Sequence, residues 1–105
     1  MTTKKFTGKL IAIDMYNCSE KIIKDEAAAK EQLQQACNSF GLQPCDIITR
    51  KEEEQSEYSL FAICKQGHVT LHIYPNMGFA TADVFSCMEG AEPENVAKFL
   101  RTYFD

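Results

Sequence analysis

Four strand-like segments joined by short connections fill the second half of this chain, and they constrain its fold more than any other feature. In residues 68–74 apolar and polar side chains alternate, so that the aliphatic residues share one face of the predicted strand. Strands with short connections pair antiparallel, because a parallel pair needs a long crossover. The segments 45–50, 58–65, 68–74 and 79–87 therefore predict an antiparallel sheet.

The sequence Pro75-Asn76-Met77-Gly78 predicts a turn between the last two of these segments. If that turn closes a hairpin, His72 lies near the turn, and Cys87 lies close to Gly67 at the far end. The polar face of these strands must then be solvated, line a site or meet a partner.

Two helices complete the predicted fold. Residues 21–40 predict one helical stretch, strongest from Asp25, with an apolar stripe at helical spacing. Asp25 is the expected cap and Gly41 the stop. Pro93 marks the first position of a second helix. Together with a buried strand at 6–16, this order predicts an α+β fold: a two-layer α/β sandwich of a mainly antiparallel sheet with two helices on one face.

Length, charge and cysteine usage narrow the classes of function. A chain of 105 residues fits a single domain, 1–105. A net charge of −4 argues against nucleic-acid binding. No apolar run reaches the roughly 18 residues of a membrane span, and no signal peptide is recognisable, so we expect a cytoplasmic protein. The five cysteines show no paired CxxC spacing, which favours free thiols and no bound metal.

The reactive residue types are concentrated in the segment 59–87. His68 and His72, the two histidines of the chain, fall on one face of one predicted strand, and Cys87 ends the next strand. A cysteine with a histidine nearby suits a nucleophile or a general acid. The alternative is that the histidines pack or face solvent and that the cysteine is a small buried hydrophobe. Residue types and spacing leave both interpretations open.

The central block of the prokaryotic S-adenosylmethionine decarboxylases is similar to the run GHVTLHIYPNMGFATADVFSC at residues 67–87. The segment Gly8–Cys18 also resembles the first strand of that family, and the resemblance covers residues 6–104. It implies the family's self-made cofactor. A serine hydroxyl attacks the preceding carbonyl, the chain is cut, and a pyruvoyl group remains as the electron sink for decarboxylation. The product of the family's reaction feeds spermidine synthesis.

The resemblance also implies roles for individual residues. Ser59 and His72 match positions that assist self-processing, and Cys87 matches the position of the general acid in decarboxylation. Active sites in the family lie at a dimer interface, so we expect a homodimer, or a heterodimer with an active paralogue.

Three positions depart from the family pattern. Gly67 stands at the precursor serine, Gln66 replaces the glutamate before it, and Asn76 replaces the glutamate that holds the ribose hydroxyls. We expect Asn76, with His68 and Tyr74, to contact a ligand. A neutral amide at that position forms a weaker bond to a ribose than a carboxylate does.

Glycine has neither a hydroxyl to attack with nor a leaving group on a β-carbon. We therefore expect no pyruvoyl cofactor, and we predict a pseudoenzyme linked to polyamine biosynthesis that binds an S-adenosylmethionine-like or polyamine ligand, or an active paralogue. Enzymatic activity stays an open question. The alternatives are an active S-adenosylmethionine decarboxylase, and different chemistry built on Cys87 and His72.

Overall fold

The computed structural model describes residues 6–42, 45–52 and 56–105. Residues 1–5, which entered the expectation of no signal peptide, lie outside these ranges. The elements in chain order are β1 (Lys9–Met15), α1 (Glu20–Ile23), α2 (Glu26–Ser39), β2 (Cys45–Glu52), β3 (Glu57–Cys64), β4 (Gly67–Tyr74), the 3₁₀ helix η1 (Pro75–Met77), β5 (Phe79–Ser86) and α3 (Pro93–Phe104).

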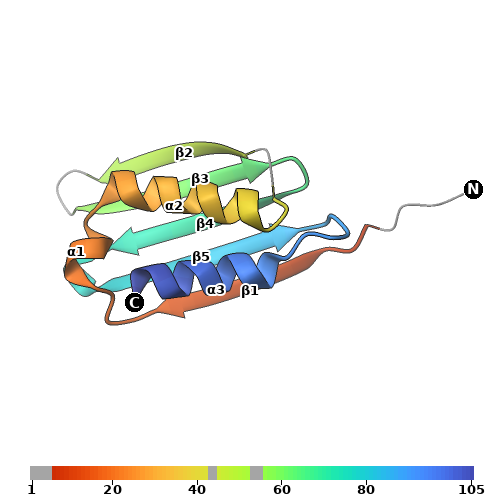
Figure 1. Ribbon diagram of the computed structural model, residues 1–105. Helices are drawn as coiled ribbons and strands as arrows, with labels where there is room; N and C mark the ends of the chain where they lie inside the picture. Colours follow the sequence, from red (N-terminus) through yellow and green to blue (C-terminus); the bar gives the residue numbers. More distant parts are fainter. Residues whose placement is uncertain (1–5, 43–44, 53–55) are drawn as a thin grey trace, which may run out of the picture.

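Within the described ranges the strands form one five-stranded sheet in the order β1-β5-β4-β3-β2, with antiparallel neighbours throughout. Helices α2 and α3 lie side by side over one face of this sheet, while the opposite face is left open (Figure 1). The predicted α+β two-layer sandwich is thereby confirmed. The same part of the chain holds no helix long and apolar enough to cross a membrane.

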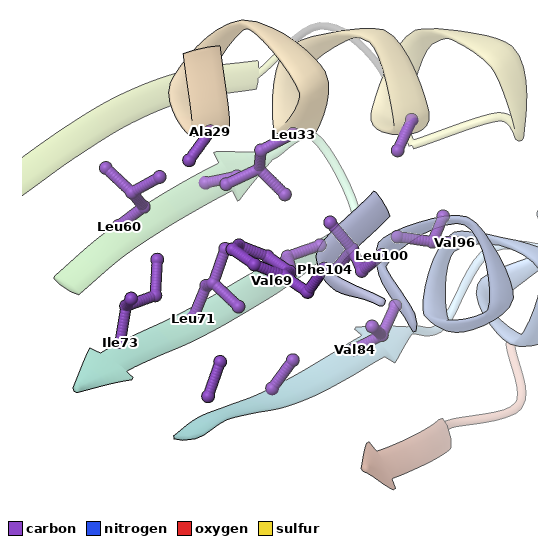
Figure 2. Packing of buried hydrophobic residues seen from close by; sticks show 14 of the residues in the cluster. Ala29, Leu33, Leu60, Val69, Leu71, Ile73, Val84, Val96, Leu100 and Phe104 are labelled. Carbon is purple, nitrogen blue, oxygen red and sulfur yellow. The ribbon is translucent and has the colours of Figure 1, made fainter. Parts of the chain in front are cut away.

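The core fills the space between the helices and the sheet. Figure 2 shows Leu33 of α2 and Leu100 and Phe104 of α3 directed toward Val69 and Leu71 of β4. All five side chains are fully buried. Burying an aliphatic or aromatic side chain of this size stabilises the fold by about 1.5–3 kcal/mol. Packing against the two helices therefore stabilises the apolar face of the sheet.

The ends of the helices follow the predicted signals. The side chain of Asp25 accepts a hydrogen bond from the Ala28 amide at 3.0 Å and caps α2. Helix α2 is followed by Gly41 at φ +85°, a left-handed conformation that favours glycine. The cap at Asp25 also separates α2 from the short helix α1, which was not foreseen as a separate element.

Two further details correct the sequence-based expectations. The turn between β3 and β4 is Lys65–Gln66, so β4 begins at Gly67, one residue before the predicted strand 68–74. Cys64 is disulfide-bonded, and the expectation of free thiols is wrong for this residue. The antiparallel register sets Cys64 opposite Cys45, a cross-strand neighbour that local CxxC spacing does not reveal.

Candidate functional site

A serine–histidine pair lies on the open face of the sheet. The register of β3 and β4 sets Ser59 directly opposite His72, and the Ser59 hydroxyl lies 2.8 Å from the His72 Nδ1 atom. Their neighbours Tyr58, Leu60 and Ile73 alternate to the helix face and are buried there. The same alternation that fills the core thus presents the hydroxyl and the imidazole to solvent, where they can bind or move a proton.

This pair opens into a cavity of about 420 Å³, within the size range of small-molecule sites. The lining combines opposite charges, hydroxyls and aromatic rings: Arg50, Glu52, Glu57, Tyr58, Ser59, Leu60, Phe61, Thr70, His72, Ile73 and Tyr74. Arg50 and Glu52 form an ion pair at 2.9 Å. The Glu57 carboxylate adds a further negative charge to the lining, so the cavity suits a ligand with both hydrogen-bonding groups and a positive charge.

A polar row crosses the sheet through this pair. The register aligns Asp14 of β1, Thr81 of β5, His72 and Ser59, with Arg50 of β2 at the other edge. The Thr81 hydroxyl donates to the Asp14 carboxylate at 2.7 Å. These partners are spread over the whole chain, so only the strand register brings them together.

Tyr58 anchors the floor of the cavity to the helical layer. Its hydroxyl donates to the Ile23 carbonyl of α1 at 2.8 Å, and its side chain is buried. Burial raises the pKa of Tyr58 above its ordinary value, because the charged phenolate would lose its hydration. The hydroxyl therefore serves as a neutral donor at physiological pH.

Gly67 and Cys87 meet at the opposite end of β4, as the hairpin prediction required. Gly67 pairs with Ser86, and both the Cys87 amide and the Cys87 thiol donate to the Gln66 carbonyl, at 3.0 Å and 3.3 Å. Cys87 is half-buried, and its thiol is free of any disulfide. In this arrangement the thiol is engaged with the backbone of the turn.

His68 is packed between two aromatic rings at this same end. Its ring stacks on Phe85 at a centroid distance of 5.4 Å and meets the edge of Phe61 at 5.8 Å. His68 does not line the cavity. Its surroundings match the packing interpretation of this histidine, and its ligand contact stays a prediction.

The remaining predicted residues lie near the turn of the β4–β5 hairpin. Tyr74 lines the cavity, and its ring stacks on Phe79 at 5.9 Å. Asn76 lies two residues further on, exposed in η1, and does not line the cavity. Of the predicted ligand-binding residues His68, Tyr74 and Asn76, Tyr74 is the one that lines the same cavity as Ser59 and His72.

The predicted site residues therefore fall into two groups. Gly67 and His72 are five residues apart on one strand, which corresponds to about 16 Å at roughly 3.3 Å per residue. Cys87 follows the residue paired with Gly67, so it lies at a similar distance from His72. We call the Ser59–His72 group the dyad end and the Gln66–Gly67–Cys87 group the junction end. Within one chain, the separation gives no support to a Cys87–His72 catalytic pair.

Residue 67 does not fit the pyruvoyl group that the sequence resemblance implies. Glycine supplies no hydroxyl, and a Cβ added at Gly67 would overlap the Phe85 carbonyl oxygen and lie 3.1 Å from Ser86 Cα. The backbone of β5 thus closes the space that a serine side chain would need.

Arg50, Glu57 and Thr81 were missed by the sequence analysis. Each looks like an ordinary exposed or half-exposed strand residue in its own segment. The signal that places them beside His72 is the register of the sheet, which local patterns do not specify.

Comparison with known proteins gives a consistent family assignment. A family model described as S-adenosylmethionine decarboxylase matches residues 9–105. The S-adenosylmethionine decarboxylase proenzyme of Methanococcus aeolicus is 27% identical over 99 residues, which are 94% of this chain and 84% of that protein. The proenzyme of a Synechococcus strain is 30% identical over 94 residues, or 90% of this chain and 73% of its own length.

A solved structure shares the fold. The crystal structure of the adenosylmethionine decarboxylase from Aquifex aeolicus superimposes with a TM-score of 0.82 at 20% identity, covering 95% of this chain and 82% of that one. At that identity the likeness concerns the arrangement of strands and helices.

Proposed function

The chain belongs to the S-adenosylmethionine decarboxylase family, and we propose that it serves polyamine biosynthesis as a member that neither cleaves itself nor carries a pyruvoyl group. The observation that carries this proposal is Gly67 at the precursor position, beside the backbone of β5. A glycine cannot supply the hydroxyl that attacks the preceding carbonyl. The chain accordingly stays in one piece.

The ligand of this protein binds at the dyad end. The cavity of about 420 Å³ contains Ser59, His72 and Tyr74, which offer hydrogen bonds and a ring face, and it carries the Glu57 carboxylate. These groups suit an S-adenosylmethionine-like nucleoside or a polyamine, both of which are cationic. The role of the chain is then to hold such a ligand, or to support an active paralogue.

The open face of the sheet is the surface for a second chain. Apolar side chains on this face are partly exposed: Leu10 by 62%, Ile48 by 54%, Phe61 by 40% and Ile63 by 45%. Exposed apolar side chains gathered on one face mark association surfaces. We propose a homodimer or a heterodimer with an active paralogue through this face.

Two measurements test the proposal. The mass of the purified chain is expected to be that of the intact 11.9 kDa protein. Two fragments with a carbonyl-reactive terminus would contradict it. Titration with S-adenosylmethionine and with spermidine by calorimetry is expected to give saturable binding of at least one. If neither compound binds, only the partner-binding role remains.

A second candidate is an active decarboxylase. The retained Ser59–His72 hydrogen bond of 2.8 Å favours it, because the pair is in position to bind or transfer a proton. Release of carbon dioxide from carboxyl-labelled S-adenosylmethionine by the isolated protein would decide for this candidate. Absence of release with intact binding supports the non-processing role.

A further inference from the structure

Strand β2 forms one edge of the sheet, and its outer side has no neighbouring strand. It stands last in the order β1-β5-β4-β3-β2, and no described helix or strand lies beyond it (Figure 1). The outward backbone amides and carbonyls of an edge strand can pair with another strand. Ile48, in the middle of β2, has a side chain that is 54% exposed. Strand β2 therefore offers an unpaired edge with an apolar centre.

The charges on the open face of β2 are self-complementary. Asp46, Ile48 and Arg50 share this face, because the register pairs each of them with an open-face residue of β3. Asp46 and Arg50 carry opposite charges and stand two residues to either side of Ile48. A two-fold axis at Ile48 therefore sets Asp46 of each copy opposite Arg50 of the other, in an antiparallel pair of β2 strands.

Other registers of this two-fold pairing do not match the charges. Residues that face each other must be an even number of positions apart if both open faces are to lie on the same side. A centre at Thr49 would set Asp46 opposite Glu52, and like charges directly opposite each other destabilise a strand pair. A centre at Ile47 would set Asp46 opposite the uncharged Ile48. Ile48 is therefore the centre that pairs Asp46 with Arg50.

The opposite edge of the sheet lacks this symmetry. On β1 the open-face residues are Leu10, Ala12 and Asp14, so a two-fold pairing centred on Ala12 would set a carboxylate opposite a leucine. Lys9 of β1 already forms an ion pair with Glu94 of α3 at 3.1 Å. Pairing of β1 with β2 would leave an unpaired edge at each end and extend without closing. The closed arrangement that the charges favour is β2 with β2.

We propose that β2 pairs antiparallel with β2 of a second copy of this chain, with Ile48 at the two-fold axis. Two five-stranded sheets then join into one. Within the described residues Asp46 has no ion pair, and Arg50, whose side chain is 78% exposed, bonds to Glu52. The partner's Asp46 gives Arg50 a second carboxylate. Because Arg50 lines the cavity at the dyad end, the second copy adds a negative charge beside that cavity.

Charge reversal tests the pairing. Asp46→Arg sets two arginines opposite each other at both ends of the strand pair, so the dissociation constant is expected to rise at least about tenfold. The double variant, Asp46→Arg with Arg50→Asp, restores opposite charges and is expected to return to within about threefold of the natural chain. Sedimentation equilibrium measures these constants. A natural chain that stays monomeric, or a double variant as weak as the single one, would overturn the proposal.

Asp83→Arg is the matched control, because Asp83 is exposed on the open face but belongs to β5, away from the β2 edge. It is expected to leave the pairing of β2 unchanged. Weakening by Asp83→Arg without weakening by Asp46→Arg would place the contact on the face of the sheet and contradict the edge pairing.

Hydrogen exchange separates an edge contact from a face contact. Amides of an edge strand point alternately into the sheet and away from it. As the protein concentration rises, exchange of every second amide in residues 46–50 is expected to slow several-fold. Association through the open face gives these amides no backbone partner. Exchange rates in this segment that do not change with concentration would refute the pairing.

The edge pairing goes beyond the proposed function and does not rest on it. Absence of β2 pairing would leave the intact mass of the chain and its ligand binding as they are. Fragments from the natural chain would contradict the proposed function and leave the β2 pairing standing.

Discussion

The two ends of strand β4 carry residues that the family resemblance groups together, yet their surroundings differ. At the dyad end, Ser59 and His72 bond to each other in the lining of the cavity. At the junction end, Cys87 bonds to the backbone of the turn, and the thiol is half-buried. Polar groups line a cavity at one end and bond to the protein's own backbone at the other.

The separation of the two ends along β4 limits how far a local change at one end reaches. The close approach of Gly67 to Phe85 affects the backbone around the turn, about 16 Å along the strand from His72. The Ser59–His72 bond depends on the β3–β4 register, which a glycine at the start of the strand leaves intact. Under the proposed function, ligand binding at the dyad end is thus independent of the residue at position 67.

The largest expected effect is a difference in thiol reactivity between Cys37 in the core and Cys87 at the junction end. Burial raises the pKa of Cys37 to about 11 and leaves its side chain inaccessible. At pH 8 we expect iodoacetamide to label Cys37 at least about 100-fold more slowly than an exposed cysteine in a peptide. Cys87, half-buried and hydrogen-bonded, is expected to label before Cys37 but no faster than the peptide.

Peptide mass spectrometry over a labelling time course measures these rates, with the urea-unfolded chain as the control in which every free thiol reacts. Labelling of Cys87 faster than the peptide would reveal an activated thiol at the junction end and would remove the contrast between the two ends.

Next in size is the effect of His72→Ala on ligand affinity. Removing the imidazole takes away a hydrogen-bonding group in the lining of the cavity, and we expect binding of S-adenosylmethionine to weaken about tenfold, or by about 1.4 kcal/mol. Asp83→Asn is the matched control, because Asp83 is exposed on the same sheet face and does not line the cavity. Calorimetry measures both affinities. Equal weakening in the two variants would place the ligand elsewhere.

A smaller effect is expected from Tyr58→Phe, which removes the hydrogen bond to Ile23 under the dyad end. The free energy of unfolding at pH 7 should fall by about 1 kcal/mol. Because burial raises the pKa of Tyr58, the protonated phenol stabilises the fold below the unfolded pKa of about 10, and this contribution is lost as pH rises beyond it. The natural chain should therefore lose stability above pH 10 more steeply than the variant.

Urea unfolding at pH 7 and at pH 10.5 checks this sign. A variant that loses stability with pH as steeply as the natural chain would exclude Tyr58 as the group responsible.

The layers of the fold could be predicted because they follow from local patterns. Alternation in 68–74 separated a core face from an open face, and Asp25, Gly41 and Pro93 marked the helix ends that the structure shows. The pattern of residues 21–40 predicts one continuous helical stretch, so it does not reveal the break between α1 and α2.

The candidate site was predictable only in part. The hairpin argument correctly placed Cys87 beside Gly67. The pairing of Ser59 with His72, and the presence of Arg50 and Thr81 beside them, depend on strand register over the whole sheet. The overlap at Gly67 depends on the approach of two backbones, which no side-chain pattern reports.

One titration tests the contrast between the two ends most directly. Addition of S-adenosylmethionine to the ¹⁵N-labelled chain, followed by backbone amide shifts, reports on both ends at once. We expect saturable shifts at Ser59, His72 and Tyr74, with the amides of Gly67 and Cys87 unchanged. Shifts centred on Gly67 and Cys87, or no saturable shift anywhere, would contradict a ligand pocket retained at the dyad end.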